Sequence, residues 1–221
     1  LNYNNNFSIL DSSDSRDLIK ASLAETVRKQ DKYFPKAAVL QNMFSLAFNR
    51  FCTQKMILDQ PYPERSFHLE QLISADFPNF EENTETILKI LAAYRHKKKR
   101  GQVMDFDDLL ENWLELLLRY GEGLPLCRQI QYILVDEYQD TNQVQANILY
   151  QLSRPHKNLM VVGDDAQSIY SWRGADFGNM LEFPERYQAV TYNMEENYRS
   201  SPDILDAANR SRSEARRVGK E

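Results

Sequence analysis

Hydrophobic positions in the first 120 residues recur every three or four residues, which is the spacing of one face of an α-helix. Pro61 and Pro63 interrupt the pattern, and the basic run 95–100 followed by Gly101 is typical of a helix end. We therefore predict a helical region, with helices over residues 14–27, 37–57, 69–73, 83–99 and one that begins after an N-cap at Asp105.

The pattern changes near residue 130, where short continuous apolar runs replace the helical spacing. Residues 132–135 and 159–162 form two such runs, and a third run, 189–194, alternates more. A helix is expected over 142–152, between the first two runs. Apolar runs joined by one helix are typical of a βαβ unit, whose strands are parallel and covered on both faces. The predicted fold class is therefore α/β.

Acidic residues follow each apolar run, at the edge where ligands bind in a parallel sheet. Asp136 and Glu137 come directly after the first run. An aspartate that holds Mg²⁺ and a glutamate that polarises the attacking water are what nucleotide hydrolysis requires. An Asp-Glu pair alone can equally begin a loop, so the octapeptide 133–140 carries more weight than the pair.

Two further segments contain candidate groups. In 161–176, Gly163 permits a tight turn off the strand, and Gln167 is a candidate sensor of a phosphate or a water. In 195–201, Arg199 is a candidate clamp for a γ-phosphate. Taken alone, this arginine fits a surface salt bridge with Glu195 or Glu196 better than a phosphate clamp.

Tyr170, Trp172 and Arg173 place two flat rings and a guanidinium within four positions. Such a set suits stacking on single-stranded bases, which stabilises binding by about 1–3 kcal/mol per base. The alternative is that both rings belong to the core. The polar neighbours Ser168 and Ser171 favour a surface site.

Composition narrows the class of protein. A hydrophobic share of 42% and a charged share of 27% are ordinary for a soluble globular chain. No stretch approaches the roughly 18 apolar residues of a membrane span, and residues 1–8 lack the features of a signal peptide. Cys52 and Cys127 lie far apart without metal-binding spacing, which predicts free thiols in a cytoplasmic, reducing setting.

The net charge of −5 is not typical of a nucleic-acid-binding protein, although a local basic stripe is sufficient for binding. The run 95–100 is a candidate for contact with a DNA backbone. The alternative interpretation is a solvated helix end.

Three segments, in matching order and spacing, resemble motifs II, III and IV of superfamily 1A helicases of the UvrD/Rep/PcrA type. These segments are residues 136–140, 163–176 and 196–200. Residues 105–110 resemble the segment that leads to motif II, and 7–11 resemble the start of the inserted helical subdomain. The resemblance spans about residues 5–209. It implies part of a RecA-like P-loop NTPase parallel sheet with a large all-helical insertion.

The resemblance also implies roles for individual residues. Asp136 would hold Mg²⁺, and Glu137 would activate the hydrolytic water. Gln167 would couple the γ-phosphate of ATP to the DNA site. Arg199 would contact the γ-phosphate, and Tyr198 would pack near the adenine.

The resemblance implies ATP-dependent translocation on single-stranded DNA and unwinding at duplex junctions, in repair or replication. The polarity that it implies is 3′–5′. Tyr170 and Trp172 would stack on bases, with Arg173 near the strand. The implied cofactors are ATP and Mg²⁺.

The resemblance divides the chain into segments, which are a helical insertion (1–104), the second half of motor domain 1A (105–186), the start of motor domain 2A (187–209) and an atypical basic tail (210–221). The composition of the tail suggests the hypothesis that it is not native helicase sequence. No Gly-x-x-x-x-Gly-Lys-Ser/Thr loop occurs in the chain, and motifs V and VI are missing. We therefore expect an interior fragment, truncated at both ends and inactive alone.

Two alternatives stay open at this point. The chain could be a non-catalytic single-stranded nucleic-acid-binding module, which the missing phosphate loop favours and the intact Asp136–Glu137 pair opposes. It could also be the motor part of a helicase–nuclease.

Overall fold

The computed structural model describes residues 3–27, 33–60, 65–164, 167–168, 174–176, 178–196, 198, 200–201, 203–204, 206–207 and 210. The chain divides into two compact units, Leu1–Phe183 and Pro184–Glu221. Most of the described structure belongs to the first unit, which contains the predicted helical region and the predicted βαβ segment.

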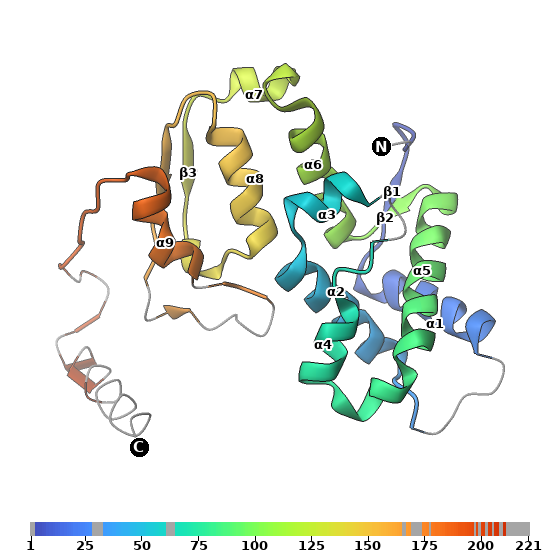
Figure 1. Ribbon diagram of the computed structural model, residues 1–221. Helices are drawn as coiled ribbons and strands as arrows, with labels where there is room; N and C mark the ends of the chain where they lie inside the picture. Colours follow the sequence, from blue (N-terminus) through green and yellow to red (C-terminus); the bar gives the residue numbers. More distant parts are fainter. Residues whose placement is uncertain are drawn as a thin grey trace. The chain divides into compact units, whose positions relative to one another are not determined.

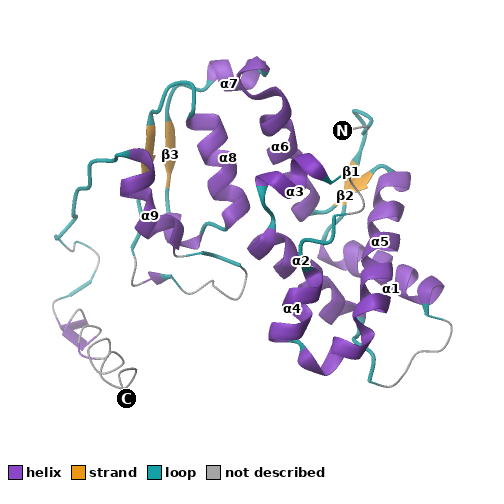
Figure 2. Ribbon diagram, in the orientation of Figure 1, coloured by secondary structure: helices purple, strands orange, loops and turns teal. Residues whose placement is uncertain are grey.

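The first unit is mostly helical (Figures 1 and 2). Its helices are α1 (Ser12–Thr26), α2 (Ala37–Phe51), α3 (Gln54–Asp59), α4 (Leu69–Asp76), α5 (Thr84–Gly101), α6 (Phe106–Tyr120), α7 (Pro125–Gln129) and α8 (Gln143–Ser153). A further helix, α9 (Gly178–Tyr187), crosses the division between the units. Short 3₁₀ turns are η1 (Pro78–Asn83), η2 (Gly121–Gly123) and η3 (Tyr138–Asp140).

The predicted helices are confirmed, with two corrections. The helix expected over 37–57 is two helices, because the Thr53 hydroxyl accepts a hydrogen bond from the backbone N–H of Met56 and starts α3. The left-handed residue at the end of α5 is Gln102, whereas Gly101 is still helical. The N-cap at Asp105 is confirmed, and Asp108 completes a capping box with it.

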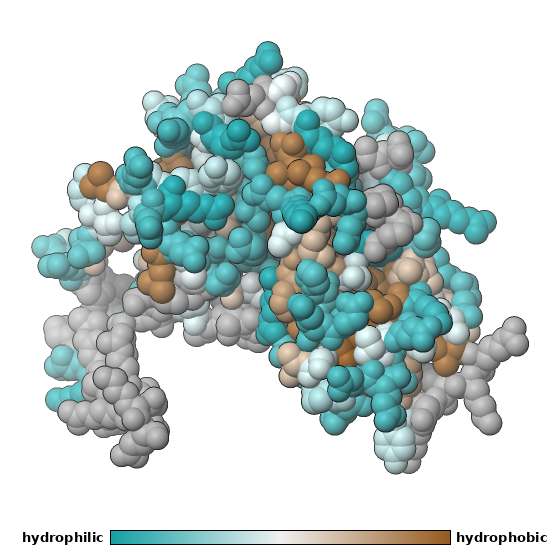
Figure 3. All heavy atoms as spheres, viewed as in Figure 1, coloured by the Kyte–Doolittle hydropathy of each residue, from teal (hydrophilic) through white to brown (hydrophobic). Residues whose placement is uncertain are grey.

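Helix α2 lies at the centre of the core and packs against α1, α4, α6 and α8. Fully buried side chains from several helices meet there, including Leu40, Met43, Ile57, Ile73, Ile87, Ile90, Leu114 and Val144. Burial of each such side chain contributes roughly 1.5–3 kcal/mol. Hydrophilic residues cover most of the face shown in Figure 3, with hydrophobic ones in separate small patches.

The two cysteines are buried free thiols, as the sequence predicts. None of the described helices combines the length and the apolar composition that crossing a membrane requires.

Two short parallel strand pairs complete the first unit. Strands β1 (Ser8–Ile9) and β2 (Val103–Met104) join the start of the chain to the segment before α6. Strands β3 (Ile133–Val135) and β4 (Leu159–Val161) pair in parallel with each other. Helix α8 connects them in the sequence. The predicted βαβ unit is therefore confirmed.

Two expectations about the strands are wrong within the described residues. The β3–β4 pair is not covered on both faces, since Leu134 and Met160 are 75% and 57% exposed. The run 189–194 forms no strand, because no described segment pairs with its backbone. Val190, Tyr192 and Met194 in this run are exposed.

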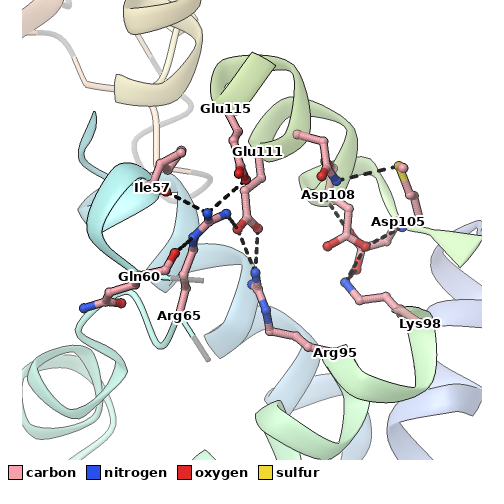
Figure 4. Close-up of polar contacts among 11 residues, drawn as sticks. Ile57, Gln60, Arg65, Arg95, Lys98, Asp105, Asp108, Glu111 and Glu115 are labelled. Carbon is pink, nitrogen blue, oxygen red and sulfur yellow. Dashed lines mark hydrogen bonds and ion pairs between the residues drawn. The ribbon is translucent and has the colours of Figure 1, made fainter. Parts of the chain in front are cut away.

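A buried group of charged residues holds α5, α6 and the segment after α3 together (Figure 4). Arg65, only 1% exposed, lies 2.7 Å from Glu111 and 2.9 Å from Glu115. It also donates hydrogen bonds to the carbonyls of Ile57 and Gln60. Nearly every donor of this guanidinium therefore has an acceptor, which is the condition under which a buried charge is tolerated.

The same cluster corrects the interpretation of the basic run 95–100. Arg95 and Lys98 are only 5% and 3% exposed. Their side chains are therefore not solvated, and they are not available to contact DNA. Arg95 pairs with Glu111 at 2.7 Å, and Lys98 pairs with Asp108 at 2.6 Å. Only part of the run therefore lies on the surface.

We predict that Arg65→Met lowers the free energy of unfolding by about 3–5 kcal/mol, because it leaves Glu111 and Glu115 buried with fewer partners. The measurement is urea unfolding of the 221-residue chain at neutral pH. Lys89→Ala, which removes an exposed pair with Glu85, is the control and should leave the midpoint nearly unchanged. Equal small effects of both substitutions would contradict the prediction.

Candidate functional site

The candidate site lies where β3 and β4 end at one edge of their sheet. The pairing continues one step past the strands, with Val162 N–H donating to the Val135 carbonyl at 2.8 Å and Tyr138 N–H donating to the Val162 carbonyl at 2.9 Å. The residues that follow each strand are therefore held side by side. This is the edge at which parallel sheets bind ligands.

Glu137 ends the extended geometry of β3, because it adopts a left-handed conformation with φ 50°. The Asp136 and Glu137 side chains are therefore not forced to opposite faces, as they would be along a strand. Asp136 accepts a hydrogen bond from the Glu137 N–H through Oδ1, at 2.9 Å. Both acids are exposed, so both can reach a ligand from solvent.

Gln139 joins the two strand ends through its side-chain amide. Its Nε2 donates to Glu137 Oε2 at 2.7 Å, and its Oε1 accepts from the Asp164 N–H at 3.1 Å. Gln167 Nε2 in turn donates to Asp164 Oδ2 at 2.7 Å. Three of the predicted site residues, Asp136, Glu137 and Gln167, are thus brought to one place through Gln139. The sequence alone predicts no role for Gln139.

Gly163 is needed here for a reason other than the predicted tight turn. Its φ is not in the left-handed region, and a Cβ at this position would lie 2.7 Å from Gln139 Oε1. The absence of a side chain therefore allows the Gln139 amide to reach the end of β4.

The 3₁₀ turn η3, which carries Gln139, is held in place by contacts with Phe183 and Thr141. The Tyr138 ring is 2% exposed and meets Phe183 edge to face, with ring centroids 5.3 Å apart. The Thr141 hydroxyl donates to the Tyr138 carbonyl at 2.7 Å. These contacts fix the backbone that carries the acidic pair.

The chain matches the model of the UvrD/REP helicase N-terminal domain over residues 1–188. The chain belongs to the UvrD/REP helicase family.

Similar proteins include the ATP-dependent DNA helicase PcrA of Leuconostoc citreum, 37% identical over 206 residues. The proteins of the same name from Bacillus subtilis and Staphylococcus epidermidis are 36% and 35% identical over 208 and 207 residues. These alignments cover 92–93% of this chain and 25–26% of the relatives. The chain therefore spans about a quarter of the length of the relatives that it matches.

The other predicted site residues lie outside the described part of the first unit. Tyr170, Trp172, Arg173 and Arg199 lie outside the described residues. Tyr198 is exposed and belongs to the second unit, so its place relative to the acids is not defined. Its hydroxyl donates to the Glu196 carboxylate, and this hydrogen bond raises the pKa of Tyr198.

Asp136 is one of the described residues that could hold Mg²⁺. It offers an exposed carboxylate, and oxygen ligands are what Mg²⁺ prefers. Among the described residues no group of three histidines, cysteines or acids could enclose a metal ion. The geometry thus fits an ion shared with substrate phosphates and water better than one enclosed by protein.

A pocket of about 550 Å³ lies between α2, α6, the end of η3 and the start of α8. No sequence pattern marks this pocket, because the acids at 107 and 108 fit the first turn of a helix. Asp108 does serve the cap, but Asp107 lines the pocket with Asn49 and Asp140. Burial, together with the charge of the nearby Asp105, raises the pKa of Asp107 to about 7.

We predict that the Asp107 carboxyl makes the chain less stable as pH rises from about 4 to about 7. Its pKa is 3.8 in a model peptide and about 7 in the folded chain, so the folded state holds the proton more tightly. The resulting stabilisation is complete below the lower value and is lost as pH rises through the higher one.

The measurement is the urea midpoint of wild type and Asp107→Asn across this pH range. Asp107→Asn should reduce the loss of stability between about pH 4 and about pH 7. Asp59→Asn, at an exposed position, should not change it. Parallel curves for wild type and Asp107→Asn would show that Asp107 does not retain the proton.

Proposed function

We propose that this chain is an interior part of an ATP-dependent DNA helicase that moves on single-stranded DNA and acts at duplex junctions, with 3′–5′ polarity. The observation that carries the proposal is the joined ends of β3 and β4, where Asp136, Glu137 and Gln167 meet through Gln139 and Asp164. Membership of the UvrD/REP family and the printed function of the PcrA relatives support it.

The proposed division of the parent protein follows the motifs. Residues 1–104 would form a helical insertion, 105–186 the second half of a RecA-like motor domain, and 187–209 the start of the next motor domain. The parallel βαβ unit with acids at its ligand-binding edge supports the motor assignment. Residues 210–221 stay unassigned, as a basic tail that departs from the family pattern.

The proposed chemistry needs a carboxylate for the metal and another for the water. Asp136 would hold Mg²⁺, which neutralises charge on the ATP phosphates when bound. Glu137 would orient and polarise the attacking water, since its Oε2 is fixed by Gln139 and its side chain accepts from no other described residue. Gln167 would report the γ-phosphate to the DNA site through its bond to Asp164.

The remaining assignments rest on the motif resemblance and on the helicase relatives. Arg199 would stabilise charge on the γ-phosphate, and Tyr198 would pack near the adenine. Tyr170 and Trp172 would stack on DNA bases, with Arg173 beside the strand.

We predict that the isolated chain releases no phosphate above background from ATP with Mg²⁺ and single-stranded DNA. Its 221 residues contain no phosphate-binding Gly-x-x-x-x-Gly-Lys-Ser/Thr loop, so nothing cradles the phosphates. In the longer protein that contains this chain, Glu137→Gln should lower kcat about 10²–10⁴-fold.

Glu182→Gln, an exposed acid in α9, is the matched control and should leave kcat unchanged. Turnover by the isolated chain that Glu137→Gln abolishes would contradict the expected inactivity. A longer protein with wild-type rates after Glu137→Gln would contradict the assigned role of this glutamate.

A further inference from the structure

Gln139 is the most deeply buried polar group next to the acidic pair, with 1% of its surface exposed. We propose that it is a positioning residue for ATP hydrolysis, which sets the orientation of the Glu137 carboxylate according to the position of the backbone after β4. The inference rests on the proposed function. It adds a residue whose side chain touches neither metal nor nucleotide in the proposed chemistry.

Both ends of the Gln139 side-chain amide are hydrogen-bonded. The donor, Nε2, is used on Glu137 at 2.7 Å, and the acceptor, Oε1, is used on the Asp164 N–H at 3.1 Å. A primary amide presents a donor and an acceptor on one rigid planar group. A displacement of the Asp164 backbone therefore changes the position from which Nε2 holds the carboxylate.

Close packing makes this link short and stiff. Gly163 leaves room for Oε1, since a Cβ would lie 2.7 Å from it and only 3.4 Å from the Gln139 backbone nitrogen. The backbone of η3 is itself held by the buried Tyr138 ring and by the bond from Tyr138 N–H to Val162. The amide therefore has little room to follow a shift at β4 without also moving against Glu137.

Asp164, which donates to Gln139, also contacts Gln167, the proposed sensor of the γ-phosphate. Gln167 Nε2 donates to Asp164 Oδ2 at 2.7 Å, so Gln167, Asp164, Gln139 and Glu137 form one continuous chain of hydrogen bonds. Through this chain, a change in Gln167 on phosphate or DNA contact reaches the water-polarising acid. Glu137 then adopts its working orientation only when Asp164 and Gln167 hold these bonds.

The test is steady-state ATP hydrolysis by the longer protein that contains this chain. Gln139→Ala should lower kcat about 10–100-fold, the usual cost of removing a group that orients a reacting ligand, with the KM for ATP unchanged. Gly163→Ala should show the same loss, because its Cβ displaces Oε1. The controls are Gln71→Ala, at an exposed position, and Gly123→Ala, where a Cβ meets nothing within 4 Å.

Two readouts separate positioning from a loss of folding. The double variant Gln139→Ala with Gly163→Ala should be no slower than Gln139→Ala alone, since both changes act through one amide. Gln139→Glu should make kcat fall with rising pH, because the new carboxyl can donate to Glu137 only while the pair holds one proton. A purely structural defect produces neither pattern.

Wild-type kcat in Gln139→Ala, additive losses in the double variant, or a wild-type pH profile in Gln139→Glu would each overturn the role of Gln139. If Gln139→Ala does not fold, as judged by thermal unfolding, Gly163→Ala and Gln139→Glu decide the question. Absence of hydrolysis by the wild-type longer protein would overturn the proposed function, and the role of Gln139 with it.

Discussion

The parallel pairing of β3 with β4 is the constraint on which the candidate site depends. Its register places Val135 opposite Val161, and the ladder continues through Val162 to Tyr138. A shift by one residue would reverse the faces of the side chains and separate the two strand ends. The acids that follow β3 and the backbone that follows β4 are neighbours only because this register holds, and the hydrogen bond from the Asp164 N–H to Gln139 Oε1 needs that proximity.

Helix α2 of the first unit contacts the residues that flank the candidate site. Asn142, the N-cap of α8, donates to Asn49 of α2 at 2.6 Å, and a Cβ at Gly174 would lie 2.7 Å from Asn49 Cβ. The positive φ of Gly174, +87°, adds a conformation that L side chains rarely adopt. The residues that flank the candidate site are thus packed against α2, whose own place is set by the core around it.

The sequence predicts those features that depend on local spacing or on neighbouring residues. The helical faces, the cap at Asp105 and the order of strand, helix and strand follow from the 3.6-residue period, from short continuous apolar runs and from capping chemistry. Features set by distant partners could not be found this way. Arg65 meets Glu111 across 46 positions, and a period cannot name its partner. Residues 189–194 have a strand-like composition, yet a strand forms only where another backbone accepts its hydrogen bonds.

The candidate site shows the same division between local and distant information. The type and order of Asp136, Glu137 and Gln167 indicate nucleotide chemistry because each is a known kind of ligand or polarising group. The sequence alone predicts no role for Gln139 because the amide acts through partners near the end of β4, and Gly163 is predicted to turn because turns are where glycine is usually needed. Both residues matter through a contact across 24 positions that leaves no local pattern. A positioning residue is defined by what it touches at both ends, so its role becomes visible only when both partners are placed.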